Sequence, residues 1–330
     1  MPEIRELHQI DLRSGHIAKL CWSHDGRFLA IPTQLGSTAI FDIEANKVTQ
    51  ILEGHSAITA VGWDPRSDLI MTGSADRSIN LWELKSVRRM PYTKNGHREA
   101  VHSVEWTDEG AFALTCSVDR IRALDGSCLA SGWTKEMEDT VNEHTGFTAA
   151  ACSFQSSFLL ASAAENGRLL ILVSLMSAAV LGRLEMERPV RSLAWSPAED
   201  ILAVGSGDRT KVYRATQHGF SDPACELTQA TPDVHAVTFS NDGSLLASRD
   251  SQGLKIWDVE GATLIVTVDD DNETLSGKGP PPGIAFHPER PWLATVMANG
   301  TGFRIADFSE LVPASVGHKV SIHQQRLWQV

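Results

Sequence analysis

Serine, histidine and aspartate recur in this chain at a spacing that could support nucleophilic hydrolysis, the chemistry of a Ser-His-Asp triad. Two such sets are His55, Ser74 and Asp76, and His97, Ser117 and Asp119. A hydrolase places one nucleophile beside a base and an oxyanion hole, whereas these sets recur together with the internal repeat of the chain. The sequence also lacks the GxSxG, phosphate-loop, dinucleotide and HExxH motifs. We therefore predict that the sets are structural and that the protein is not an enzyme.

The acidic tract at residues 269–273 could bind calcium, because carboxylate oxygens are the ligands that calcium prefers. It lacks, however, the alternate-position spacing and the glycine of a calcium-binding loop. Glycine and proline residues follow it, so residues 269–282 are predicted to form a long loop. Long loops on a rigid scaffold often carry recognition. We expect Asp269, Asp270 and Asp271 to be candidate partner-binding residues, and we predict no metal or cofactor.

The composition points to a folded protein without a broad nucleic-acid surface. The 330 residues are 42% hydrophobic and 21% charged, as in an ordinary globular chain. There are 29 Lys and Arg residues against 41 Asp and Glu residues, a net charge of −12, which disfavours contact with many phosphates. No apolar stretch is long enough for a membrane-spanning helix, and the N-terminus lacks a secretory signal.

The cysteines bear on the compartment. Five occur, at positions 21, 116, 128, 152 and 225, and none forms a CxxC pair. This pattern indicates neither a disulfide framework nor a zinc site. We expect a reducing compartment, the cytoplasm, with the nucleus as an alternative.

The elements that position all these residues come from an internal repeat. An aromatic or cysteine anchor followed by a polar turn occurs seven times, with spacings between 41 and 47 residues. The anchors are Trp22, Trp63, Trp106, Cys152, Trp195, Phe239 and Phe286. An apolar residue six positions after each anchor opens a new run of period two, which predicts β-strands. Each unit is predicted to contain three or four short strands, and a single such sheet cannot bury both faces unless others pack around it.

The best copy of the repeat carries Gly54-His55, Trp63, a Ser74-Ala75-Asp76 turn and Leu81-Trp82-Glu83, and the sixth copy ends in Trp257-Asp258. Over essentially the whole chain this pattern resembles the WD-repeat β-propellers. The resemblance implies an all-β fold: one seven-bladed β-propeller of four-stranded antiparallel blades, closed by a terminal strand. The predicted blades within this single domain, 1–330, cover residues 16–54, 55–96, 97–143, 144–187, 188–230, 231–278, and 279–316 together with 4–12.

Two segments could close the ring. Residues 4–12 precede Gly15-His16 as a fourth strand should, and residues 310–316 precede Gly317-His318 in the same way. We favour the N-terminal strand, because closure between distant segments protects both edges of the array. Residues 317–330 then form a tail, and the chain could be part of a longer protein.

The resemblance also implies a structural role for His55, Ser74, Asp76 and Trp82. In the family these positions form a hydrogen-bonded chain that sets the twist and register of a blade. In the third blade Leu124 occupies the tryptophan position and cannot donate a hydrogen bond, so this blade is expected to be less rigid.

Two groups of cations are candidate partner-binding residues. Arg77, Arg120 and Arg209 each follow the acid of a turn that the resemblance places on the upper rim, where a guanidinium could bind carboxylate or phosphate. Arg88, Arg89 and Tyr92 belong to a basic segment that leads into the third blade.

These observations favour a non-catalytic scaffold that binds a protein or peptide partner through the upper face and its loops. A partner that carries acidic groups would suit the arginines of the upper rim. Two alternatives stay open: a sensor or regulatory domain of a larger signalling protein, and a propeller enzyme or small-ligand binder with a site in the central channel. The oligomeric state is open as well.

Overall fold

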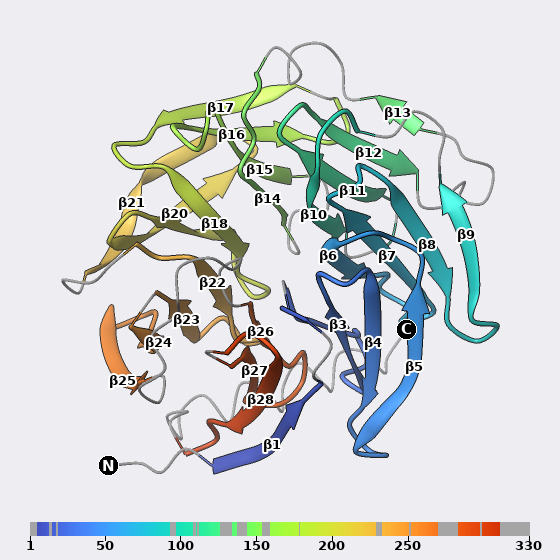
Figure 1. Ribbon diagram of the computed structural model, residues 1–330. Helices are drawn as coiled ribbons and strands as arrows, with labels where there is room; N and C mark the ends of the chain where they lie inside the picture. Colours follow the sequence, from blue (N-terminus) through green and yellow to red (C-terminus); the bar gives the residue numbers. More distant parts are fainter. Residues whose placement is uncertain are drawn as a thin grey trace, which may run out of the picture.

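The structure is a computed structural model in which 28 strands occur in the described residues, and no helix occurs among them (Figure 1). The described residues are 5–12, 15–17, 19–92, 97–107, 110, 112–125, 134–136, 144–153, 159–177, 179–228, 233–250, 252–269, 283–297 and 299–310. The strands form seven antiparallel sheets of four strands each. The predicted seven-bladed all-β fold is therefore confirmed.

Each sheet is one blade, and six of them contain four consecutive strands. The first has β2 (Cys21–Trp22), β3 (Phe28–Pro32), β4 (Ser37–Asp42) and β5 (Lys47–Glu53). The second has β6 (Ile58–Trp63), β7 (Leu69–Ser74), β8 (Ile79–Glu83) and β9 (Arg88–Tyr92). The third has β10 (Val101–Trp106), β11 (Phe112–Ser117), β12 (Ile121–Asp125) and β13 (Thr134–Glu136).

The remaining blades continue the series. The fourth has β14 (Ala149–Cys152), β15 (Leu159–Ala164), β16 (Leu169–Ser174) and β17 (Val180–Glu185). The fifth has β18 (Val190–Trp195), β19 (Ile201–Ser206), β20 (Arg209–Thr216) and β21 (Gly219–Thr228). The sixth has β22 (Ala236–Phe239), β23 (Leu245–Arg249), β24 (Gly253–Asp258) and β25 (Thr263–Asp269). The seventh has β26 (Ile284–Phe286), β27 (Trp292–Val296), β28 (Gly302–Asp307) and β1 (Arg5–Asp11).

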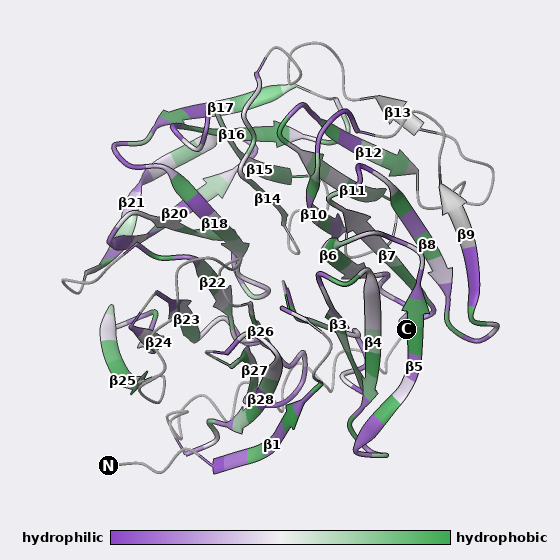
Figure 2. Cartoon of the chain, in the orientation of Figure 1, coloured by the Kyte–Doolittle hydropathy of each residue, from purple (hydrophilic) through white to green (hydrophobic). Residues whose placement is uncertain are grey.

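The core lies between neighbouring blades. The described residues contain seven hydrophobic clusters, and each joins two adjacent blades; one, for example, unites Ile40 and Leu52 of the first blade with Trp63 and Trp82 of the second. Second strands such as β15 and β19 are buried along their whole length, whereas the outer strand β5 alternates between exposed and less exposed residues. Figure 2 shows the hydropathy of the residues along the strands, with hydrophilic and hydrophobic residues mixed on the outer strand β5. A strand covered on both faces needs small or apolar residues throughout, as LLASAA and ILAVGS provide.

Three of the four anchor tryptophans join adjacent blades through a repeated hydrogen bond. Their indole Nε1 groups donate to carbonyl oxygens of the preceding blade, Trp22 to Ala285 (3.0 Å), Trp63 to Cys21 (3.1 Å) and Trp195 to Ala151 (2.9 Å). Each acceptor directly precedes the anchor residue of its own blade. The repeat spacing of the sequence therefore places the donor and acceptor of each of these bonds at equivalent positions.

A terminal strand closes the ring, as predicted. The N-terminal strand β1 pairs with β28, with Arg5 opposite Asp307 and Asp11 opposite Gly302, and the two strands lie side by side in Figure 1. The inner strands β2 and β26 are also in contact. At this junction His287 Nε2 lies 2.9 Å from the carbonyl oxygen of Gly26. The alternative closing segment, residues 310–316, lies outside the described residues except for its first position.

Antiparallel order determines which turns share a face of the ring. In every blade the turn between the second and third strands lies on the same side as the connection to the next blade, because successive strands reverse direction. We call this side the upper face. The other two turns of each blade lie on the lower face.

Candidate functional site

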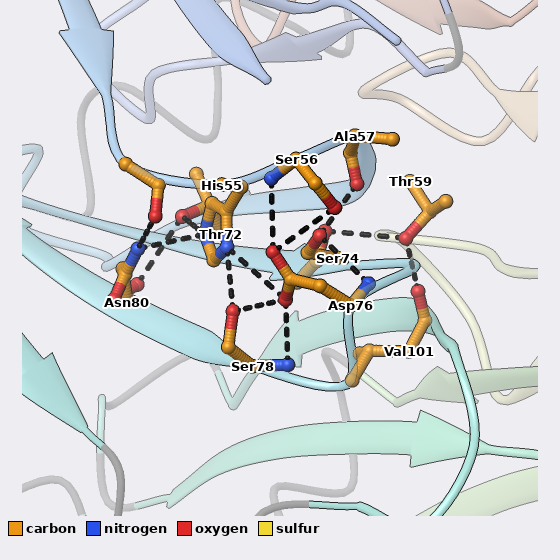
Figure 3. Close-up of polar contacts among 12 residues, drawn as sticks. His55, Ser56, Ala57, Thr59, Thr72, Ser74, Asp76, Ser78, Asn80 and Val101 are labelled. Carbon is orange, nitrogen blue, oxygen red and sulfur yellow. Dashed lines mark hydrogen bonds and ion pairs between the residues drawn. The ribbon is translucent and has the colours of Figure 1, made fainter. Parts of the chain in front are cut away.

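The polar residues of the second blade form a connected network under the upper face (Figure 3). The buried side chain of His55 has its Nδ1 2.8 Å from Ser78 Oγ and its Nε2 2.8 Å from Thr72 Oγ1. The indole of Trp82 donates to the same Thr72 oxygen at 2.9 Å. Asn80 Nδ2 donates to the Gly54 carbonyl at 3.1 Å. The network ties the strands of the blade to the connection that enters it.

The hydroxyl that links histidine to tryptophan belongs to Thr72 and not to Ser74, which corrects this part of the sequence interpretation. Trp82 lies opposite Ile70 in the register of β7 and β8, so Thr72 is the next residue of β7 on the same face. Ser74 lies about 7 Å further along the strand. Its hydroxyl donates instead to the Ala57 carbonyl at 2.6 Å.

Asp76 anchors the turn between β7 and β8. It accepts hydrogen bonds from the backbone N–H groups of Ser56 and Ser78, both at 2.9 Å, and from the Ser78 hydroxyl. Burial acts to raise the pKa of Asp76, but these hydrogen bonds outweigh it and hold the pKa well below its ordinary value. Burial lowers the pKa of His55 despite the neighbouring Asp76, so the imidazole is neutral at pH 7. Ser78 bridges the two side chains, whose nearest atoms are 3.8 Å apart.

This geometry differs from that of a hydrolase triad. In a triad the serine and the acid bind opposite nitrogens of the imidazole. Here Ser78 and Asp76 both lie at Nδ1 of His55, and Nε2 is taken by Thr72. The Ser78 hydroxyl donates to Asp76, so the histidine is not positioned to take its proton.

The third blade keeps part of the network. His97 has Nδ1 3.2 Å from Asp119 and Nε2 2.9 Å from Thr115 Oγ1, so threonine again takes the place expected for the strand serine, Ser117. Burial lowers the pKa of His97 to about 4, against the opposing effect of Asp119. Leu124 is buried where the second blade has its tryptophan.

In the sixth blade a charged pair replaces the histidine part of the network. Trp257 Nε1 donates to Ser248 Oγ at 2.8 Å, and the buried ammonium of Lys255 donates to the buried carboxylate of Asp250. Lys255 lies opposite Ser248, as Asn80 lies opposite Thr72 in the second blade. The sequence interpretation missed this pair. It could have been found from a lysine between apolar residues of one strand and an aspartate directly after the neighbouring strand.

The three arginines predicted on the upper rim do lie at upper turns, but they have different surroundings. Arg77 is exposed, with a backbone φ of 74°, and has no ion-pair partner among the described residues. Arg120 Nε lies 3.1 Å from Asp119, its neighbour in the chain. Arg209 Nη1 lies 2.7 Å from Glu226. The structure therefore does not present three equivalent unpaired cations.

The other candidate residues lie on outer strands or beyond the described residues. Arg88 and Arg89 are exposed on β9, where Arg89 Nη1 lies 3.4 Å from the Gly54 carbonyl. Tyr92 pairs through its backbone with Ile79, and its side chain is not described. Asp269 is the last residue of β25, and Asp270 and Asp271 lie outside the described residues.

In the described part of the chain, no helix is long and apolar enough to cross a membrane. No group of three His, Cys, Asp or Glu side chains in those residues could hold a metal ion.

The chain is similar to known proteins in its sequence repeat and in its fold. The family model for the WD domain, G-beta repeat, matches residues 46–83, 88–121, 181–210 and 222–258. Two of these segments begin within the outer strand of one blade, the second begins at the first residue of the outer strand β9, and the first begins one residue before the outer strand β5. Each segment ends in or at the start of the third strand of the next blade. One sequence repeat therefore covers parts of two blades.

Curated relatives match over much of the chain at low identity. Cell division cycle 20.4, cofactor of APC complex, from Arabidopsis thaliana is 25% identical over 78% of this chain and 59% of its own length. Anaphase-promoting complex subunit cdc20 from Dictyostelium discoideum is 22% identical over 78% of this chain and 52% of its own length. The chain thus spans less than two thirds of these relatives.

A solved structure matches the fold. The β-propeller domain of Cps50 (Swd1) from Myceliophteria thermophila has a TM-score of 0.76 at 17% identity, covering 93% of this chain and all of that one. At this identity the likeness concerns the fold alone.

Proposed function

Because the chain belongs to the WD-repeat β-propeller family, we propose that it is a non-catalytic scaffold that binds a protein or peptide partner through its upper face. The observation that carries this proposal is the pattern of exposure on three neighbouring upper turns. Leu35 in the first blade is 70% exposed and Val118 in the third is 46% exposed, with exposed Arg77 between them. Apolar side chains beside a cation suit a protein surface that carries acidic groups.

The polar networks also support the proposal that the propeller is a scaffold. His55 and His97 are buried and hydrogen-bonded within their blades, which supports a structural role for these residues in the scaffold. Two of the relatives are named as a cofactor or a subunit of the anaphase-promoting complex, which supports a protein partner within a large assembly.

We also propose a reducing compartment, the cytoplasm or the nucleus, and one propeller domain over residues 1–330. Free thiols at all four described cysteines support the compartment. The alternative of a regulatory domain within a longer protein is compatible with the coverage of the relatives.

A comparison of the two faces tests the proposal. One variant combines R77E, R120E and R209E on the upper face, and its matched control combines R66E, K85E and R214E on the lower face, where all three side chains are exposed. Affinity purification with cross-link mapping measures which partners bind and where. We expect the upper variant to lose the partner by roughly tenfold or more, and the control to retain it. Cross-links confined to the lower face, with capture unaffected by the upper variant, would contradict the proposal.

A further inference from the structure

Two hollows flank the connection between the fourth and fifth blades on the upper face. The smaller, of about 120 Å³, is lined by Met186, Glu187 and Arg188 of the connection and by Ser206, Asp208, Arg209 and Lys211 of the turn between β19 and β20. The larger, of about 330 Å³, lies on the other side of the same connection. It is lined by Thr148, Asn166, Pro189, Val190 and Arg191.

The smaller hollow contains two cations without an ion-pair partner among the described residues. Arg209 is held by Glu226 at 2.7 Å and lies 3.7 Å from Asp208. In contrast, Arg188 and Lys211 have no acid within ion-pair distance among the described residues. Three cations and two carboxylates line the hollow, and Glu226 beside Arg209 brings the acids to three. The attraction for an anion comes from the two unpaired cations, in a chain whose net charge is −12. An anionic group would therefore find local attraction there against the overall field of the protein.

The larger hollow has a different character. The guanidinium of Arg191 is paired with Asp233 at 3.2 Å, so its charge is compensated. Thr148 donates its hydroxyl to the Val190 carbonyl at 2.8 Å, which turns its polar group away from a ligand and leaves its methyl group. Pro189 adds aliphatic surface, next to the buried Val190. An apolar side chain fits these walls better than a charged one.

The walls of both hollows are held in place by the scaffold. The Ser206 hydroxyl donates to the Arg188 carbonyl at 2.6 Å. Gly207 has a φ of +57°, and a Cβ at this position would come within 3.0 Å of the Arg188 stem, so the glycine allows this arginine to lie across the turn. The backbone N–H of Val190 donates to the Gly167 carbonyl at 2.9 Å. A pre-formed site of this kind loses little entropy when it binds a ligand.

We propose that this edge of the fifth blade is a two-point site for a peptide segment of the partner, with an acidic side chain in the smaller hollow and a nearby apolar side chain in the larger. The inference rests on the proposed function and adds the location and the chemistry of the bound segment. Arg188 and Lys211 bind the acid, with Arg209 oriented beside them by Glu226. Pro189 and the methyl group of Thr148 receive the apolar group.

The experiment selects peptides on the full chain from a display library of random peptides about a dozen residues long. The test variant combines R188Q and K211Q, which removes both charges and keeps most of each stem, and R66Q combined with K85Q on the lower face is the matched control. Neither Arg188 nor Lys211 belongs to the upper-face variant described above. Thermal unfolding verifies that both variants fold.

Wild-type chain should enrich peptides in which an Asp or Glu lies within a few residues of a Leu, Ile or Val. Binding should fall roughly tenfold in the R188Q/K211Q variant and when the acid of the peptide is changed to its amide, and remain in the R66Q/K85Q control. Replacement of the apolar residue of the peptide by serine should weaken binding as well.

Three results would overturn the site: no enriched peptide, enrichment without an acid, or enrichment that R188Q/K211Q does not affect. If the partner is still lost in the upper-face variant, such a result removes this site and leaves the scaffold proposal intact. Partner capture that no upper-face variant reduces would instead contradict the proposed function itself.

Discussion

At the scale of single residues, the second blade depends on one hydroxyl group that joins two rings. Thr72 is fully buried and contacts both His55 and Trp82, so its removal leaves two buried polar groups without this partner. Ser74 is buried two residues away, and its hydroxyl donates to the carbonyl of Ala57, the residue before β6. Sequence alone cannot separate the two, because both are small hydroxyl residues on one face of β7.

A double-mutant cycle distinguishes these hydroxyls. We expect the T72V and W82F pair to show a coupling energy of about 0.5–2 kcal/mol in the free energy of unfolding, because the two residues share a buried hydrogen bond. The S74A and W82F pair serves as the control and should be additive within about 0.5 kcal/mol. Urea unfolding of the single and double variants measures both values. Equal coupling in the two cycles would contradict the assignment of Thr72.

At the scale of the strands, closure of the ring depends on a segment that is distant in sequence. β1 covers the edge of β28, and its inward residues Leu7 and Ile10 pack against the cluster shared by the first and seventh blades. Without β1 the edge strand would expose its backbone donors and acceptors, which promotes association between molecules.

Deletion of residues 1–12 should therefore lower the free energy of unfolding by several kcal/mol and cause self-association. Urea unfolding measures the first effect and light scattering after gel filtration measures the second. A synthetic peptide of residues 1–12, added in trans, should restore stability by occupying the edge of β28. A truncated protein that stays monomeric and as stable as the intact chain would show that β1 does not close the ring.

At the scale of the whole molecule, buried histidines make the stability of the ring depend on pH. Burial lowers the pKa of His97 and of His287 to about 4 in each case. His287 lies at the closure, where its Nδ1 accepts from the N–H groups of Glu289 and Arg290, both at 3.0 Å, and its Nε2 donates to Gly26. This arrangement requires the neutral imidazole, because a protonated Nδ1 cannot accept a hydrogen bond.

The direction of the pH effect follows from the lowered pKa values. The unfolded chain binds protons at these histidines near pH 6.5, whereas the folded chain does so only near pH 4. The stabilisation is complete above pH 6.5 and is lost as the pH falls toward 4. We expect roughly 2 kcal/mol of loss for each histidine between pH 7 and pH 5.

Urea unfolding at several pH values measures this slope, which H97Q and H287Q should each reduce. H218Q, at an exposed turn between β20 and β21, is the matched control. A slope that neither buried variant changes would show that other groups govern the acid sensitivity.

The number of blades, the period-two strands and the anchor positions could be predicted from the sequence, because they depend on local alternation and on a spacing that every copy repeats. Much of the candidate site was within its reach too, since His55, Asp76 and the arginines of the upper turns could be located from the same spacing. The structure was needed to establish the role of Thr72 in place of Ser74, the Lys255–Asp250 pair and the cations that have no acidic partner. These depend on which side chains meet across strands and blades, and distances of a few ångströms between residues far apart in the chain are not encoded in the repeat itself.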